Sequence, residues 1–363
     1  MKANYNDIKS KYILKTIFEN LTRRKFLDVI HYNKDIKKKV EISLNDYILF
    51  SQIEIELRIK QSLIDKYEKN KFMFINYNNE NEKYIHIYFN GDKQKEIKIN
   101  YINKTDNNIS KINIVIDYKM TSLKNLFKDC VCLKEISFLR FNRKNITDIS
   151  FMFQNCLFLE IISFSQFQTE NVKKMNNMFY GCPLLEEINL NNFDTNKVED
   201  MSFLFYNCRK LKKLDILNLN TSNVKNMSCM FGGCSLLTLI NFDKKFNTNR
   251  VENMSGMFLE CLGLEKLDLS IFYTNNVTNM EWMFYKCSKL KELNLKNFNI
   301  NKVEDMHSMF SGCNNLVTLT ISNDFETKNA KDVYNMFENC KTSLINKIKL
   351  QNKKIKYEAF ISN

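Results

Sequence analysis

The chain has 363 residues and a formal net charge of +13, and 44% of its residues are hydrophobic. A single proline and only seven glycines exclude a Pro- and Gly-rich disordered chain, and the hydrophobic share is enough for a sizeable core. The basic excess is spread along the chain, whereas a nucleic-acid-binding protein usually gathers it on one face or in one run. We therefore expect no specific binding of nucleic acid. No run of about 18 apolar residues occurs, so no membrane-spanning helix is predicted.

The two ends of the sequence are not expected to carry a targeting signal. The first residues read MKANYNDIKSKYILKTIF and contain neither an uninterrupted apolar stretch nor a small-residue cleavage site. The last residues, KIKYEAFISN, contain no anchor signal. This pattern predicts a protein that is cytoplasmic or otherwise intracellular.

Residues 1–110 are predicted to form a small α+β domain, with helices at about 8–39 and strands at about 41–102. Apolar residues first recur at helical spacing and then alternate as they do in strands. Within the second part, strands are expected at Tyr84–Phe89 and at Glu96–Ile102. This region therefore differs in kind from the rest of the chain.

A further strand is expected at Lys111–Ile116. It lies one period before Ser137 and Phe138, which belong to the repeat described next. We therefore expect the N-terminal domain to lead directly into the repeat region. It should also cover the end of that region, because an open end of a repeat array exposes apolar side chains.

The dominant feature of the sequence is an internal repeat. Nine of the eleven cysteines recur at steps of 26 or 27 residues: Cys130, Cys156, Cys182, Cys208, Cys234, Cys261, Cys287, Cys313 and Cys340. A phenylalanine stands three residues before each of them: Phe127, Phe153, Phe179, Phe205, Phe231, Phe258, Phe284, Phe310 and Phe337. The pattern L-x-x-(L/I)-x-apolar follows each of the first eight cysteines. A fixed period of this length is typical of a solenoid.

Each unit is predicted to form one coil of a leucine-rich-repeat-like solenoid. The alternation at the end of L-x-x-L-x-L predicts a short strand, and successive coils would stack these strands in parallel. The stretch V-x-x-M-x-x-M-F-x-x-C predicts a short helical or 3₁₀ turn, capped by the Asx residue that often precedes its first Met. The two 27-residue steps place their extra residue in predicted loops, at Asp243–Phe246 and Asn323–Phe325. The solenoid is predicted to span residues 111–343 in about nine coils, with a C-terminal cap over residues 344–363.

From Asn276 to Leu295 the repeat reads N-V-x-N-M-x-x-M-F-x-x-C-x-x-L-x-x-L-x-L, and it recurs from Asn223 to Phe242. These residues resemble the BspA-like leucine-rich repeat in its 26-residue bacterial-surface-protein form. The resemblance implies a solenoid used for adhesion or protein binding. Members of that family are often secreted or tethered to the surface, which makes the cell surface the alternative location.

A second resemblance lies near the N-terminus. The segment from Tyr12 to Lys39 contains an I-L-x-x-I-F-x-x-L core followed by a second helical pattern, and it is weakly similar to an F-box. An F-box joined to leucine-rich repeats would imply a substrate adaptor of a ubiquitin ligase.

The ladder cysteines are interpreted as small buried hydrophobes of the core rather than as metal ligands. The predicted core ladder consists of Cys156, Cys182, Cys208, Cys234, Cys261, Cys287, Cys313, Phe179, Phe205, Phe231, Phe258, Phe284 and Phe310. A zinc site would need closely spaced ligand pairs, which the 26-residue spacing does not provide. Intracellular thiols also stay reduced. We therefore expect eleven unpaired thiols and no metal or cofactor site.

No catalytic motif is recognised. The three histidines, His31, His86 and His307, are far apart in the sequence, and neither a P-loop nor G-x-S-x-G occurs. The chain is therefore predicted not to be an enzyme.

A candidate binding face follows from the strand pattern. In L-x-x-L-x-L the residue between the last two apolar positions is predicted to point outward. The middle members of this polar column are Ser163, Asn189, Asp215, Asn241, Asp268 and Asn294. They either contact a ligand or only solvate an exposed sheet.

The sequence thus predicts a non-enzymatic protein–protein interaction module that presents a leucine-rich-repeat surface to a protein ligand of unknown identity. Two alternatives stay open, namely the F-box-like adaptor and a cell-surface adhesin. The oligomeric state is not predicted.

Overall fold

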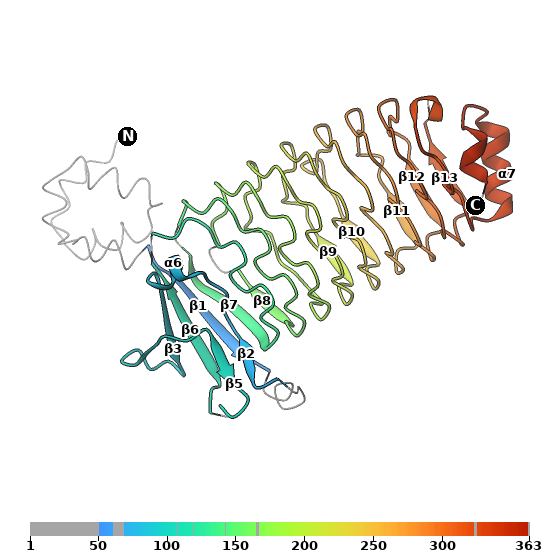
Figure 1. Cartoon of the computed structure of the whole chain (residues 1–363). Coiled ribbons are helices and arrows are strands. Elements are labelled where there is room, and N and C mark those ends of the chain that lie inside the picture. The colour runs from blue at the N-terminus through green and yellow to red at the C-terminus, as the bar shows by residue number, and fades with distance from the viewer. Residues whose placement is uncertain are drawn as a thin grey trace, which may run out of the picture.

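A computed structural model of the chain describes residues 51–60, 69–106, 108–117, 119–141, 143–164, 167–322 and 325–361. A small sheet domain leads into a long solenoid that ends at a helix (Figure 1). The helices expected at about 8–39, and with them the F-box-like segment, lie outside the described residues. The leucine-rich-repeat-like solenoid predicted from the sequence is confirmed.

The N-terminal domain and the first coils share one six-stranded sheet. Its strands, in the order in which they lie side by side, are β4 (Glu96–Ile97), β3 (Ile85–Phe89), β6 (Lys111–Ile116), β1 (Ile53–Ile59), β7 (Leu133–Phe141) and β8 (Ile161–Ser163). A second pair of strands, β2 (Lys71–Met73) and β5 (Tyr101–Asn103), and the short helix α6 (Asn79–Glu82) complete the domain. The alternation in β1 buries Ile53, Ile55 and Leu57 on one face of the sheet.

Two expectations for this domain are corrected. The single strand expected at Glu96–Ile102 is two strands, β4 and β5, because the chain bends at residues 98–100 and passes from one sheet to the other. The strand at Lys111–Ile116 is not the direct neighbour of β7. Instead β1 lies between them and pairs antiparallel with both, so the domain joins the solenoid through β1.

The solenoid strands pair in parallel with a register of one repeat. Beyond β8 they are β9 (Lys213–Asp215), β10 (Leu239–Asn241), β11 (Lys266–Asp268), β12 (Glu292–Leu295) and β13 (Thr318–Ile321). Leu293, for example, lies between Leu267 of the preceding coil and Leu319 of the following one. The inward residues of each strand therefore stack on their counterparts.

The parallel sheet is interrupted twice. Residues 187–189 form no strand, although the coils before and after them do, and β10 does not pair with β11. The second break, between β10 and β11, lies in the coil with the extra residue at Asp243–Phe246. This insertion was predicted to lie in a loop, and the loop comes directly after β10. The strand side of the solenoid is thus less tightly hydrogen-bonded than its opposite side.

The expected helical or 3₁₀ turn before each ladder cysteine is instead a run of consecutive β-turns. Between Met201 and Cys208 the N–H groups of Leu204, Tyr206 and Cys208 each bond to the carbonyl three residues earlier, at 3.0–3.3 Å. The intervening N–H groups of Met201, Phe203 and Phe205 bond to the next coil, at 2.8–3.0 Å. An α-helix would instead point every N–H along its own axis, toward the carbonyl four residues earlier. In this segment, N–H groups that bond within their own coil alternate with N–H groups that bond to the next coil. The second set ties neighbouring coils together.

The Asx residue at the start of this segment bonds to the backbone as expected, but it forms an Asx turn rather than a helix cap. The side-chain oxygens of Asp200 and Asn226 accept from the N–H groups of Ser202 and Ser228, at 2.9 and 3.0 Å. Single parallel bridges join these positions from coil to coil, and their rungs are Ser122, Asp148, Lys174, Asp200, Asn226, Asn253, Asn279, Asp305 and Asp332. Among the described residues these nine positions form one continuous ladder along the solenoid.

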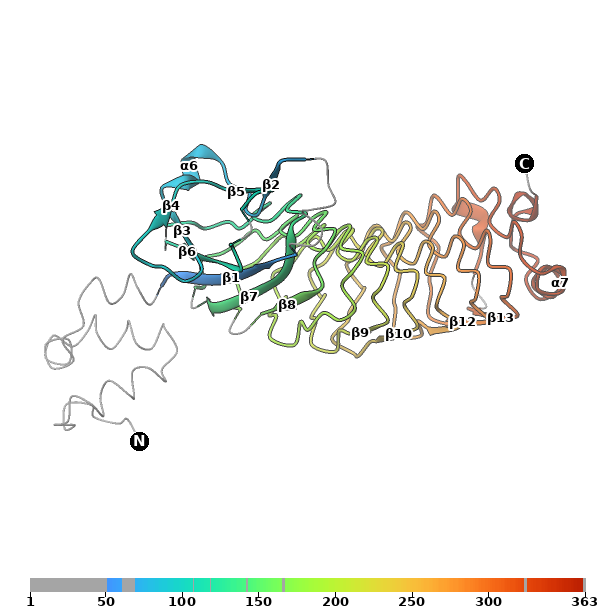
Figure 2. The ribbon, with the colours of Figure 1, turned by 90° about the horizontal axis from the view of Figure 1, so that it is seen from below.

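The C-terminal end of the solenoid is covered by η2 (Thr327–Asn329), α7 (Thr342–Gln351) and η3 (Tyr357–Phe360). Figure 2 shows α7 at the end of the solenoid opposite to the sheet domain. Leu344 and Ile348 of α7 are buried, and Phe360 stacks on Phe337 with ring centroids 5.3 Å apart. In the described part of the chain, no helix combines the length and the apolar character needed to span a bilayer.

Candidate protein-binding face

The structure places all thirteen residues of the core ladder in the interior, with 0% exposure. The phenylalanine rings stack in one continuous column from Phe127 to Phe360, with neighbouring centroids 5.2–5.9 Å apart. Stacked coils with a repeat near 5 Å make this arrangement a direct consequence of the 26-residue period. These residues hold the scaffold together and do not reach its surface.

The ladder cysteines have a specific bonding role. From Cys156 to Cys340 each thiol donates to the carbonyl oxygen of the ladder phenylalanine in the preceding coil, over 3.0–3.2 Å. Burial raises the pKa of Cys208, Cys287 and Cys340 to about 12. The protonated thiol is the form that donates, so burial and bonding favour the same state. All eleven cysteines, which lie within the described residues, are unpaired.

The polar column predicted as a binding face lies on the outside of the strands. Asn189, Asp215, Asn241 and Asp268 are exposed, whereas Ser163 and Asn294 are half-buried. Four of the side chains also serve the fold, because the oxygens of Asn189, Asp215, Asp268 and Asn294 accept from the N–H two residues later. The structure therefore brings the six positions together on one surface and gives four of them a local structural task.

Sequence reasoning missed the positions that precede this column along each strand. We name as the strand face the outward side chains of residues 160–163, 186–189, 212–215, 238–241, 265–268, 291–294 and 317–320. Ion pairs cross it between coils, such as Lys266–Glu292 and Lys291–Glu265, both at 2.7 Å. Among these charges three apolar side chains are exposed, namely Ile161 at 51%, Leu239 at 44% and Val317 at 44%. The only signal for them in the sequence is their place two or three residues before the polar column.

A hollow lies where the sheet is first interrupted. It measures about 600 Å³ and is lined by Glu160, Ile161, Ile162, Leu184, Glu186, Glu187, Asn189 and Lys210. Glu160 and Glu186 are engaged in ion pairs with Lys134 and Lys212. The hollow thus combines a partly exposed aliphatic floor with a charged rim, which is the usual composition of a protein-binding surface.

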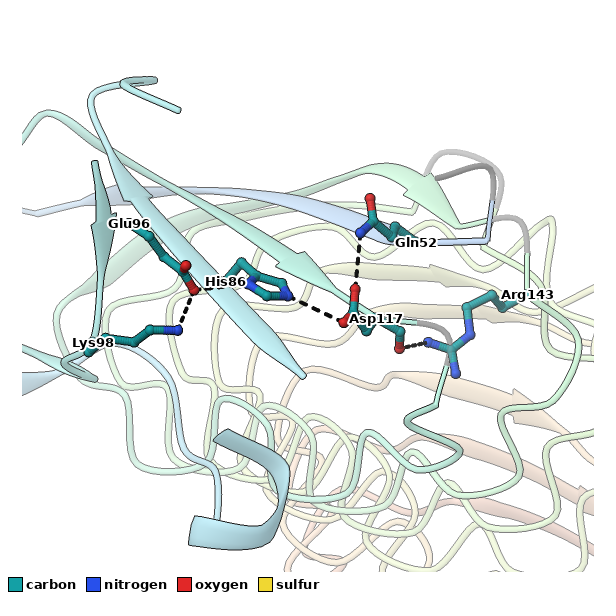
Figure 3. Close-up of polar contacts among 6 residues, drawn as sticks. All are labelled: Gln52, His86, Glu96, Lys98, Asp117 and Arg143. Atoms are coloured by element: carbon teal, nitrogen blue, oxygen red, sulfur yellow. Dashed lines mark hydrogen bonds and ion pairs between the residues drawn. The ribbon is translucent and has the colours of Figure 1, made fainter. Parts of the chain in front are cut away.

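A polar cluster joins the sheet domain to the first coil (Figure 3). His86 lies between two carboxylates, with Nδ1 2.8 Å from Glu96 and Nε2 3.3 Å from Asp117. Asp117 also accepts from Gln52 at 3.0 Å. The pKa of Glu96 is lowered, chiefly by the hydrogen bond that it accepts from Lys98. These side chains come from β3, β4 and the ends of β1 and β6 and bond to one another, so their role is to connect the strands of the sheet.

Arg143 completes this junction. Its side chain is fully buried and donates to the carbonyl oxygen of Asp117 at 2.7 Å and to Asn145 at 3.1 Å. In most later coils the equivalent position is a buried threonine, whose hydroxyl donates to the next coil, as Thr169 does to the carbonyl of Asp194 at 2.9 Å. Arg143 thus bonds to the sheet domain that precedes its coil, whereas the threonines bond to the coil that follows theirs. In the described residues no group of three or more His, Cys, Asp or Glu is placed to hold a metal ion.

Stacked coils of 26 residues, each with an L-x-x-L-x-L strand and a Met-Phe-Cys turn, define a BspA-like leucine-rich-repeat solenoid, as the sequence resemblance implied. Residues 121–242 and 239–350 match the family described as "Mycoplasma protein of unknown function, DUF285". The chain belongs to this family, since the two matches cover more than half of it.

Two solved structures are similar to this chain. A leucine-rich repeat protein from Bacteroides ovatus ATCC 8483 shares 16% identity, with 62% of this chain and 70% of that one covered and a TM-score of 0.33. A leucine rich cell surface protein from Faecalibacterium prausnitzii A2-165 shares 16% identity, with 54% and 62% covered and a TM-score of 0.30. No curated protein matches the chain.

Proposed function

We propose that this protein is a non-enzymatic interaction module that binds a protein ligand through its strand face. The observation that carries the proposal is the exposure of Ile161 and Leu239 among charged and amide side chains on that face. Aliphatic anchors within a polar surround are typical of protein-binding surfaces. Both side chains stand on strands, whose backbone positions the solenoid holds in place.

The role is binding rather than catalysis because the polar groups of the strand face are engaged with one another. Asn294 donates to Asp268 at 2.9 Å, and Lys212 pairs with Glu186 at 2.9 Å. A catalytic site would instead place a nucleophile beside a base that activates it. The strand face offers complementary shape and charge to a partner and no such pair.

The proposal is tested with two double variants that change charge equally. Ile161→Arg with Leu239→Arg alters the strand face, and Leu350→Arg with Tyr357→Arg alters the exposed C-terminal cap, where the two side chains are 81% and 72% exposed. Extracts of the source organism are passed over each immobilised protein. We expect one or more proteins to be retained by the wild type and by the cap variant and to be lost from the strand-face variant. Equal retention by all three proteins would show that the strand face is not the binding surface.

We propose an intracellular location, with the cell-surface adhesin as the alternative. The unpaired state of all eleven thiols is the expected one in a reducing compartment. Protease added to intact cells distinguishes the two locations. An intracellular protein survives the treatment, whereas loss of the protein from intact cells would establish the adhesin.

A further inference from the structure

A second surface of the solenoid differs from the strand face in its charge. It lies where each coil bends between strand and turn segment, at the residues that flank the buried valines of the repeat. Two adjoining hollows of about 320 and 500 Å³ occur there and share Lys225 and Arg250 as lining residues. We name as the bend groove the surface lined by Lys173, Lys197, Glu199, Asn223, Lys225, Arg250, Glu252, Asn276, Thr278 and Lys302.

The cations of the bend groove outnumber the two carboxylates of its lining. Lys173, Lys197, Lys225, Arg250 and Lys302 are all exposed, and among the described residues none of them forms an ion pair with a carboxylate. On the strand face, by contrast, Lys212, Lys266 and Lys291 each pair with a glutamate of a neighbouring coil. Because its cations form no ion pairs within the described part of the chain, unlike the lysines of the strand face, the bend groove can bind an anion from outside the protein.

Three of these cations are held in place by neutral side chains. Lys197 donates to the amide oxygen of Asn171 at 2.5 Å, Arg250 to that of Asn223 at 2.8 Å, and Lys302 to that of Asn276 at 2.8 Å. Each asparagine is itself anchored, because its Nδ2 donates to a backbone carbonyl of the preceding coil at 2.6–2.8 Å. A cation bonded to an amide keeps its full charge, and its restrained position lowers the ordering cost of binding.

The cations also have a regular spacing. Lys197, Arg250 and Lys302 occupy the same position in every second coil, with an asparagine in the coil between. Coils joined by parallel bridges repeat at the strand spacing, so two coils correspond to about 10 Å. Glu199 and Glu252 lie in the same coils as Lys197 and Arg250. A ligand of the groove should therefore carry its negative charges at intervals, where they meet the cations and avoid these two carboxylates.

We propose that the bend groove binds an acidic polysaccharide that carries about one anionic group per disaccharide, a ligand that the protein would meet in the alternative, cell-surface location. The length of a disaccharide unit is comparable to the spacing of the three cations, so successive carboxylate or sulfate groups would meet Lys197, Arg250 and Lys302 in turn. Duplex DNA carries one charge per about 1.7 Å, which is far denser, and Glu199 and Glu252 would repel it. The groove lining contains no aromatic ring on which bases of a single strand could stack. It also lacks the apolar anchors that a peptide partner requires.

The test measures binding of the full chain to defined oligosaccharides by calorimetry at about 0.15 M ionic strength. A hyaluronan hexasaccharide supplies one carboxylate per disaccharide, a chondroitin sulfate hexasaccharide adds sulfate, and a chitin hexasaccharide is the neutral control. We expect both acidic hexasaccharides to bind, the neutral one not to bind, and affinity to increase from tetrasaccharide to hexasaccharide as the third cation is reached. The stronger of the two acidic probes identifies the preferred anion. Failure of both to bind would overturn the proposal.

Two triple variants separate the groove from net charge. Lys197→Gln, Arg250→Gln and Lys302→Gln change the groove, whereas Lys212→Gln, Lys266→Gln and Lys291→Gln remove the same charge from the strand face. We expect the groove variant to bind the better hexasaccharide at least tenfold more weakly and the strand-face variant to stay within twofold of wild type, with thermal melts confirming that both fold. If both triple variants lost affinity for the hexasaccharide equally, binding would depend on net charge alone, and the proposal would be overturned. Tighter binding of a thymidine 20-mer or of polyglutamate than of either hexasaccharide would assign the groove to a different ligand class and overturn the proposal.

Discussion

The Sγ atom of Cys234 donates a hydrogen bond to the carbonyl oxygen of Phe205, 3.1 Å away in the preceding coil. The same carbonyl accepts from the backbone N–H of Cys208 at 3.0 Å. A carbonyl oxygen has two lone pairs, and the thiol uses the one that the turn leaves unused. This explains why the repeat keeps cysteine beside phenylalanine. The residue is small enough for the core, and it adds one bond between coils.

This bond requires a protonated thiol, so stability should depend on pH in the alkaline range. Burial raises the pKa of Cys208 from 9.0 to about 12. In that window the unfolded chain releases the proton while the folded chain keeps it, so the stability of the fold decreases as pH rises from about 9 towards about 12. One such thiol contributes up to about 1.4 kcal/mol of lost stability per pH unit.

The measurement is the urea midpoint at pH 7 and at pH 10.5 for the wild type and for Cys208→Ala. The variant is expected to be less stable at pH 7 but to lose less between the two pH values. An unchanged loss would mean that Cys208 does not carry a raised pKa in the folded state.

The coil and its core could be predicted because burial repeats with the period of the chain. A phenylalanine three residues before a cysteine, at every twenty-sixth position, leaves few places for either side chain other than the interior. The form of the turn could not be predicted, because spacings of three and one suit a helix and a run of β-turns equally. What decides between them is the bonding of alternate N–H groups to the next coil, which no single repeat reveals. A usable signal was the Asn or Gly before several cysteines, as at Asn155, Gly181, Asn207 and Gly233, where φ is positive.

The candidate face was predictable only in part, for a similar reason. Alternation along one strand places Asp215 and Asn241 outside, and the structure shows both exposed. The same alternation places Leu239 outside as well, two residues before Asn241. How much of its side chain stays exposed depends on which side chains of neighbouring coils lie beside it. The position of β1 between β6 and β7 likewise follows from pairing between distant segments, which local alternation does not specify.

The contrast between core and strand face is tested by a pair of alanine substitutions. Phe231 is fully buried, with rings 5.9 and 5.4 Å away on its two sides. We expect Phe231→Ala to lower the free energy of unfolding by about 3–5 kcal/mol, as deletion of a buried phenylalanine usually does. Asn241→Ala, on the exposed side of β10, should cost less than about 0.5 kcal/mol. Urea titrations of both variants measure the difference, and small equal effects would contradict the stacked-ring core.

The turn geometry makes a prediction of the opposite sign. Lys286 has a φ of 55°, in the left-handed region, at the position that is glycine in the coils of Gly181, Gly233 and Gly312. A left-handed conformation costs a residue with a side chain about 1 kcal/mol. Its ion pair with Glu260, at 3.6 Å, is exposed and contributes little. Lys286→Gly should therefore raise the free energy of unfolding by about 0.5–1 kcal/mol.

Lys289, three residues further on, provides the matched control. It is exposed and does not have a positive φ, so Lys289→Gly removes the same side chain and charge without relieving strain. Glycine there only adds conformational freedom to the unfolded chain, and we expect a loss of about 0.5–1 kcal/mol. Thermal and urea unfolding of the two variants should thus shift in opposite directions. If Lys286→Gly destabilised the protein as much as Lys289→Gly does, residue 286 would not be left-handed, and the helical turn first expected for this segment would describe it better than consecutive β-turns.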